Sequence, residues 1–333
     1  MVRSINSCVT GKAFLSCHTH LTGTHLKNTW QIMSEQYWLD KLRRLNTAHG
    51  TGPRTGKAPH KPLLLLSLFD AFEADEIEAR LFTRTPELVV RFLNYSAIST
   101  DRWPGKLKIK MPFFHLSSQQ FWVSFDTKMN AATVDSAFVN ELDEKFFSFC
   151  QQPAFRLKAR CILIAEHFTE KEQVALFAAV GLGDQAVAQT IRNQIPEDAP
   201  LAEAKGRSTR FRSDVVIKYH RTCALTGYRC DTTQGSSIVD AAHIVPFSKS
   251  QNDQLQNGLA LSKNAHWMFD EGLWAVSDDF RVLVQSKRFV EVGPDTFLLR
   301  NLKGNYLQFD PNANLRPSKA LLSEHRRSHS FSA

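Results

Sequence analysis

Polar side chains in the last third of the chain have the types and spacing of a centre that could hydrolyse a phosphodiester. His243 ends the short apolar segment Ile238-Val-Asp-Ala-Ala-His243, which predicts a strand. Asn257 follows fourteen residues later, and His266 begins the segment His266-Trp-Met-Phe-Asp270. Positions four apart on a helix share a face, so His266 and Asp270 could hold one divalent cation together. A histidine that takes a proton from water, beside a cation that offsets phosphate charge, is suited to this hydrolysis.

The segment that carries these residues resembles the HNH nucleases, which have a ββα-metal fold. The resemblance covers about residues 209–327. Two motifs, Cys223-Ala-Leu-Thr-Gly227 and Ala242-His-Ile-Val-Pro246, are similar to those of a subgroup found in bacterial restriction endonucleases. The resemblance implies a metal-dependent DNA endonuclease with four site residues: His243 as general base, Asn257 as the amide that orients its loop, and His266 and Asp270 as ligands of Mg²⁺ or Mn²⁺.

One position departs from the family pattern. Many HNH nucleases carry an acid or a histidine directly before the base as a further metal ligand, and this chain has Ala242 there. Asp240 lies two residues earlier, on the same side of the predicted strand as Ala242, so it could supply the ligand, or water could fill the position. Asp240 could equally be a strand-edge acid that contacts backbone or an arginine. A DNA-binding protein with a degenerate nuclease site is therefore an alternative.

The first half of the chain alternates predicted helices with a predicted hairpin. Ser34 can cap an N-terminal helix, and the apolar run 63–72 predicts a buried helix with Pro62 in its first turn. Segments 108–116 and 121–125 are predicted to pair as a hairpin. Further helices are expected within 134–168 and 170–194, which makes the predicted fold class α+β.

Residues 33–168 resemble the sulfur-binding domain of phosphorothioate-dependent restriction endonucleases. The resemblance rests on His60-Lys-Pro-Leu-Leu-Leu-Leu66, on Met111-Pro-Phe-Phe-His-Leu116 and on Phe121-Trp122. It implies that the partner is double-stranded, phosphorothioated DNA, with Pro112 as a rigid apolar wall for the sulfur and Met111 and His115 beside it. Family members often have an aromatic residue before this proline. Met111 stands there in this chain, and methionine is also soft and apolar.

Cations near these motifs are expected to contact DNA phosphates, because such contacts supply most of the affinity for DNA. The candidates are Arg54, Lys57, Lys61, Arg102, Lys106, Lys108 and Lys110. A solvated edge strand is the alternative explanation of the lysines. A hairpin core is the alternative explanation of Pro112.

Composition sets further bounds on the function. The formal net charge is +8, of which residues 205–333 contribute +6, so a polyanionic partner is favoured and should meet this part most strongly. The six cysteines form no CxxC pair, and there is no run of 18 apolar residues. We therefore expect a cytoplasmic protein with reduced thiols and no membrane partner.

The predicted organisation is a mixed helical and hairpin DNA-reading domain followed by a ββα-metal nuclease domain. Its parts are an arm or non-native extension at 1–32, with Met33 as the natural start, the reader at 33–168, a helical linker at 169–208 and the nuclease at 209–333. This order predicts a modification-dependent restriction enzyme of bacterial defence. Cutting both strands needs two active sites, which favours a homodimer. A nuclease that reads another mark or an unmodified sequence is the other alternative.

Overall fold

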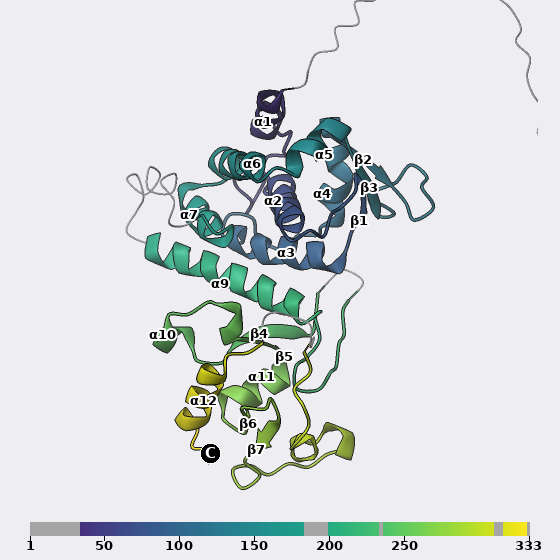
Figure 1. Ribbon diagram of the computed structural model, residues 1–333. Helices are drawn as coiled ribbons and strands as arrows, with labels where there is room; N and C mark the ends of the chain where they lie inside the picture. Colours follow the sequence, from purple (N-terminus) through teal and green to yellow (C-terminus); the bar gives the residue numbers. More distant parts are fainter. Residues whose placement is uncertain (1–33, 183–198, 233–235, 310–315, 332–333) are drawn as a thin grey trace, which may run out of the picture. The chain divides into compact units, whose positions relative to one another are not determined.

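The computed structural model of the chain describes residues 34–182, 199–232, 236–309 and 316–331 (Figure 1). The arm predicted at residues 1–32 lies outside these ranges, as does the end of the helix predicted at 170–194. The described residues combine helices with small antiparallel sheets, so the predicted α+β class is confirmed.

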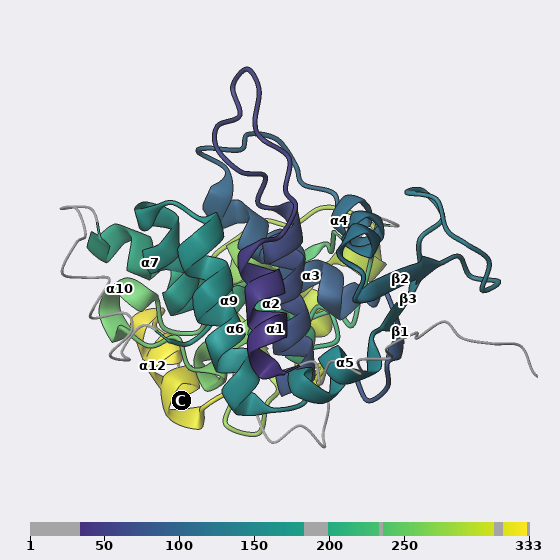
Figure 2. The ribbon, with the colours of Figure 1, turned by 90° about the horizontal axis from the view of Figure 1, so that it is seen from above.

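The helix α2 (His60–Glu73) is the centre of the first hydrophobic core. Leu63, Leu64, Leu65 and Leu66 are all completely buried, so this helix is enclosed on every side and is not amphipathic. It packs against α3, α4 and α6 (Figures 1 and 2). The helices around it are α1 (Glu35–Arg43), α3 (Pro86–Ser96), α4 (Lys110–His115), α5 (Glu144–Cys150), α6 (Pro153–His167) and α7 (Glu170–Ala179), with the 3-10 turns η1 (Ala97–Ser99) and η2 (Leu116–Gln119).

The sheet of the first core corrects one prediction. Strands β1 (Leu81–Thr83), β3 (Val139–Leu142) and β2 (Trp122–Phe125) pair antiparallel in that order. The predicted hairpin partner at 108–116 is instead the helix α4, so the hairpin was wrong. The carbonyl of Phe113 in α4 accepts hydrogen bonds from Trp122 Nε1 at 2.7 Å, Ser124 Oγ at 3.1 Å and Asn140 Nδ2 at 3.2 Å. These tertiary contacts hold α4 against the sheet and override the strand-like composition of the segment.

The second core contains the predicted strand, strand and helix. Strand β4 (Val239–His243) pairs antiparallel with β5 (Gly258–Ser262), and α11 (Lys263–Asp270) follows directly. Thus His243 ends a strand and the pair His266 and Asp270 lies on a helix, as predicted. The other elements are α10 (Phe247–Ser250), η3 (Leu255–Asn257), β6 (Trp274–Val276), β7 (Val282–Val284), η4 (Asp295–Phe297), η5 (Leu299–Leu302) and α12 (Lys319–Ser328).

The helix α9 (Ala199–Lys218) contributes buried residues to the second core and also packs against helices of the first. It packs against α7 and α3 on one side and against β4 and β5 on the other (Figure 1). A Cβ added at Gly206 would collide with the carbonyl oxygen of Ala175 in α7, so only glycine allows this close approach. Further along, Phe211 and Val215 are buried in the second core. Within the predicted linker 169–208, the described residues 174–177, 179, 180 and 182 belong to the first core, whereas residues 183–198 lie outside the described ranges.

No helix in the described ranges is long and apolar enough to cross a membrane.

Candidate functional site

The ring of His243 is fixed on two sides. Its Nε2 lies 2.8 Å from Oδ1 of Asp253, and its plane stacks on Phe211 of α9 with the ring centroids 3.9 Å apart. In the β4–β5 register His243 lies opposite Gly258, where a Cβ would collide with Val215 of α9. This glycine therefore lets α9 come close enough for Phe211 to stack on the histidine.

Asn257 ties together the loop that follows β4. It is completely buried, and its Oδ1 accepts from the amide of Val245 at 2.9 Å. Its Nδ2 donates to the carbonyls of Val245 at 3.0 Å and Asn252 at 2.9 Å. Because His243 and Asp253 lie at the two ends of this loop, the amide keeps them in contact. A buried amide with all these partners is costly to replace.

Asp253 was not found by sequence reasoning. It lies in a polar segment of the kind that usually forms a solvated loop, and ten residues separate it from His243. A carboxylate only accepts hydrogen bonds, so Nε2 of His243 donates in this contact, which in the neutral ring leaves the lone pair on Nδ1. The pair therefore has the arrangement of an oriented general base.

The candidate metal ligands meet on α11. Nε2 of His266 and Oδ2 of Asp270 lie 3.4 Å apart. Burial raises the pKa of Asp270, and the nearby His266, His329 and His243 act in the opposite direction. An imidazole and a carboxylate on one helix face suit a divalent cation. Within the described residues no group of three or more His, Cys, Asp or Glu could hold a metal ion, so water or DNA oxygens would complete the coordination.

Asp240 and Ala242 form no hydrogen bond or ion pair with His266 or Asp270 in the described ranges. Ala242 is completely buried in the second core, so its small apolar side chain fits the packing there. Asp240 accepts from the amide of Ala241 at 2.9 Å and lines a cavity with Lys106 and Arg212. Neither His266 nor Asp270 lines that cavity. Metal ligation by Asp240 stays a prediction without a contact in its favour.

A buried histidine of α12 packs against α11. The ring of His325 in α12 stacks on Phe269 with the centroids 3.8 Å apart, and its Nε2 lies 3.2 Å from the carbonyl oxygen of Phe269. Burial and the nearby His329 lower the pKa of His325 to about 4. This histidine is therefore neutral in the folded protein at neutral pH.

The predicted sulfur-contact residues lie on α4, but not all at its surface. Met111 and His115 are four residues apart and both exposed, so they share one helix face. Pro112 is buried. Met111, with 41% of its surface exposed, presents the apolar surface at this point. Lys61 at the start of α2 lies nearby, since its Nζ donates to Ser118 Oγ at 3.0 Å just beyond α4.

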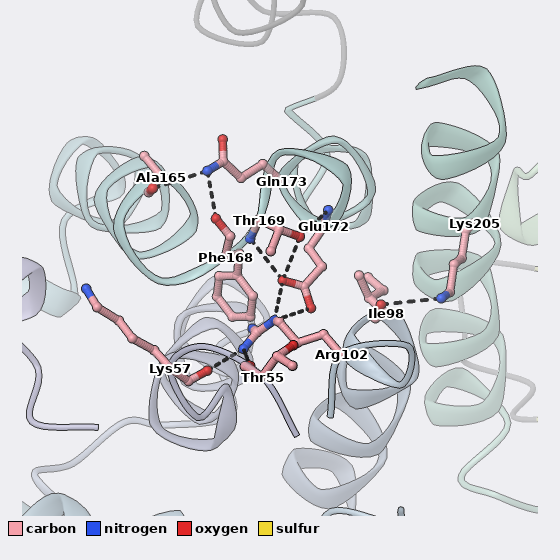
Figure 3. A network of polar contacts seen from close by, with 10 residues as sticks. All are labelled: Thr55, Lys57, Ile98, Arg102, Ala165, Phe168, Thr169, Glu172, Gln173 and Lys205. Atoms are coloured by element: carbon pink, nitrogen blue, oxygen red, sulfur yellow. Dashed lines mark hydrogen bonds and ion pairs between the residues drawn. The ribbon is translucent and has the colours of Figure 1, made fainter. Parts of the chain in front are cut away.

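Arg102 has a structural contact that sequence reasoning did not anticipate. Its Nε donates to Glu172 of α7 at 2.9 Å, in a pair whose side chains are almost fully buried. Its Nη1 donates to the carbonyls of Thr55 and Lys57 (Figure 3). Arg102 thereby fixes the glycine-rich loop that carries Arg54 and Lys57.

The other cations predicted to contact phosphate differ in the partners that their side chains have. Lys57 donates to the carbonyl of Glu166 at 3.2 Å, and Lys106 donates to Ser236 Oγ at 2.7 Å. Lys110 forms an ion pair with the exposed Asp135, and Lys108 is exposed. Their ammonium groups lie at or near the surface, where DNA could replace these partners.

His60 and Trp103 adjoin the loop and were also missed. Arg54 lies over the ring of Trp103, 5.4 Å from its centroid, and His60 meets the same ring edge-on at 5.6 Å. Burial and the charge of Arg54 lower the pKa of His60 to about 4. The contacts join residues that are more than forty positions apart, which local sequence patterns do not reveal.

Comparison with known protein families identifies both the N-terminal and the C-terminal part of the chain. Residues 223–277 match the HNH endonuclease family, and residues 35–185 match the ScoMcrA-like DNA sulfur-binding domain family. The chain thus joins a sulfur-binding domain to an HNH nuclease domain. The first match includes every predicted nuclease residue and Asp253. The second extends past the boundary predicted at 168 and includes α7.

Two solved structures are also similar to parts of the chain. One is the "Modification dependent TagI restriction endonuclease", with 21% identity, 37% of this chain covered and a TM-score of 0.29. This chain spans 38% of that chain's length. The other is the "Sulfur binding domain of SprMcrA complexed with phosphorothioated DNA", with 17% identity, 45% of this chain and 96% of the other covered, and a TM-score of 0.35. No curated protein matches the chain.

The lowered pKa of His325 predicts a loss of stability in acid. Between about pH 6.5 and pH 4 the unfolded chain binds a proton at this residue that the folded protein excludes, so the free energy of unfolding falls as the pH falls. The contribution is up to about 3 kcal/mol. Urea unfolding at several pH values should show a shallower pH dependence for His325→Gln than for the wild type, with the exposed His49→Gln as control. Equal slopes for His325→Gln and the wild type would contradict the assignment.

Proposed function

We propose that the chain is a metal-dependent DNA endonuclease that recognises phosphorothioated DNA through its N-terminal domain and hydrolyses phosphodiesters through its HNH domain. The observation that carries this proposal is the presence of both domain families in one chain. The N-terminal family binds sulfur in DNA, and a backbone phosphate that carries sulfur is a phosphorothioate, which supports this ligand here.

His243 is the general base in this proposal. With Nε2 donating to Asp253, its Nδ1 can accept the proton of the attacking water. Phe211 and Asn257 hold the ring and the loop, so the base needs little reorganisation when DNA binds. His266 and Asp270 would hold Mg²⁺ or Mn²⁺, and such an ion supplies positive charge that offsets the charge on the scissile phosphate and the leaving oxygen.

Binding of phosphorothioated DNA would combine apolar contact with the sulfur and ionic contacts with the neighbouring phosphates. Sulfur in place of a non-bridging oxygen makes one face of the phosphate larger and less hydrated. The exposed thioether of Met111, with His115 on the same face, offers a soft apolar contact for that sulfur. Lys61 and the loop with Arg54 and Lys57 would contact the neighbouring phosphates, which adds affinity without discrimination.

Asp253 is a positioning residue in this mechanism, and Asp253→Asn tests it. We expect the rate of DNA cleavage to fall by up to about 10²-fold, with DNA affinity unchanged, because the amide no longer favours the correct tautomer of His243. The exposed Asp295→Asn is the matched control. An unchanged rate would remove Asp253 from the mechanism.

Met111→Glu tests how the mark is recognised. A carboxylate at this exposed position replaces apolar surface and repels the phosphate, so the preference for phosphorothioated over unmodified duplex should fall towards one. The measurement is the ratio of the two dissociation constants, by fluorescence anisotropy at one fixed salt concentration. Met129→Glu makes the same change at another exposed methionine and should keep the ratio.

Two results would count against the reading of phosphorothioate by α4. A wild-type ratio of one would mean that the domain reads another mark or an unmodified sequence. A full wild-type preference in Met111→Glu would place the sulfur contact elsewhere in the domain.

A further inference from the structure

Two adjoining cavities lie where the reader side of the chain meets α9 and β4. The larger, of about 470 Å³, is lined by α3, by Lys106, by Arg212 of α9 and by the segment that leads into β4, including Asp240. The smaller, of about 60 Å³, is lined by residues 106–110 and by Arg84. Both cavities are lined by Leu93 and Lys106, so they form one groove centred on Lys106.

The charge of this groove is almost entirely positive. Its lining cations are Arg84, Lys106, Lys108, Lys110 and Arg212, and its one lining acid is Asp240; Lys110 also pairs with Asp135 outside the lining. The smaller cavity has four of these cations and no acid. A concentration of one sign of charge in a concave surface attracts a polyanion and raises its local concentration.

The two arginines at the ends of the groove have no acidic partner in the described ranges. Arg84 lies 5.9 Å from the ring centroids of both Phe113 and Phe138, and burial lowers its pKa. Arg212 is exposed, and its guanidinium makes no hydrogen bond or ion pair with the described residues. By contrast, Arg91, Arg160 and Arg221 all pair with carboxylates. A half-buried cation without an anion is costly, so Arg84 points to an anionic ligand outside the chain, and the exposed Arg212 is available to the same ligand.

Along the chain, the residues that line the groove adjoin both parts of the protein that are proposed to contact DNA. Residues 106–110 run directly into α4, where Met111 and His115 are exposed. Asp240 lies on β4, the strand that ends with His243. A DNA molecule that is engaged at both places has to bring backbone between them.

We propose that this groove binds the sugar–phosphate backbone of the DNA between the mark and the cleavage site, with Arg84 and Arg212 each contacting a phosphate. The inference rests on the proposed function and extends it, because it assigns a third DNA contact that belongs to neither site. It also gives Asp240 a role as the acid that limits the affinity of the groove, in place of metal ligation.

The test is the affinity of Arg212→Gln for two phosphorothioated, fluorescein-labelled duplexes. One duplex is just long enough to cover the mark, and the other continues well beyond it. For the longer duplex we expect an affinity several-fold lower than that of the wild type. The slope of log K against log salt should be smaller by about 0.9, the value for one lost phosphate contact. The affinity for the short duplex should be unchanged.

Two further variants test whether the effect is specific to the groove. Arg44→Gln removes the same charge from an exposed arginine that lines neither cavity, and it should leave the longer duplex unaffected. Asp240→Asn removes the acid and should raise the affinity for the longer duplex. Equal affinity of Arg212→Gln and the wild type for the longer duplex would overturn the proposal, as would an equal loss for both duplexes.

The outcomes separate this inference from the proposed function. A wild type that prefers phosphorothioated DNA, combined with an unaltered Arg212→Gln, rejects the groove alone. A wild type without that preference, combined with an Arg212→Gln variant that loses affinity only for the longer duplex, rejects the reading of phosphorothioate and keeps the groove. A wild type that binds neither duplex rejects both.

Discussion

The arrangement of the candidate nuclease centre depends on the packing of α9, which belongs to the second hydrophobic core and lies against helices α3 and α7. Glycines at two interfaces of this helix allow it to come unusually close to its neighbours: Gly206 against α7, and Gly258 of β5 against Val215. The close contact at Gly258 allows the ring of Phe211 to stack on the ring of His243. Asn94 Nδ2 of α3 also donates a hydrogen bond of 2.7 Å to Ser213 Oγ of α9. The histidine is therefore held by packing that also contacts the reader.

Much of the nuclease site could be predicted because its signals are local. The spacing of His266 and Asp270 fixes a common helix face, and an apolar run before His243 specifies a strand. Asp253 and Phe211 could not be found in this way, because their contacts with His243 exist only after the loop and α9 have packed. The same reason explains the error at α4, where three donors to the carbonyl of Phe113 decide the structure of a segment whose composition suits a strand.

Charge in this protein serves structure as well as DNA binding, and only the structure separates the two uses. Arg102 was a reasonable candidate for a phosphate contact by sequence position, yet its guanidinium is occupied by Glu172 and by loop carbonyls (Figure 3). Arg212 was not a candidate by sequence position, and its guanidinium has no such partner among the described residues. Burial and partners, more than sequence position, therefore indicate which cations are available to DNA.

Recognition and hydrolysis can be tested together by cleavage of two duplexes of identical sequence, one of them phosphorothioated, with the wild type and with His243→Ala in Mg²⁺. We expect the wild type to cleave the phosphorothioated duplex faster. We expect His243→Ala to lose about 10²–10⁴ in rate, with binding preserved, because the variant lacks the general base. Equal cleavage of both duplexes by the wild type, or near wild-type cleavage by His243→Ala, would contradict the proposed function.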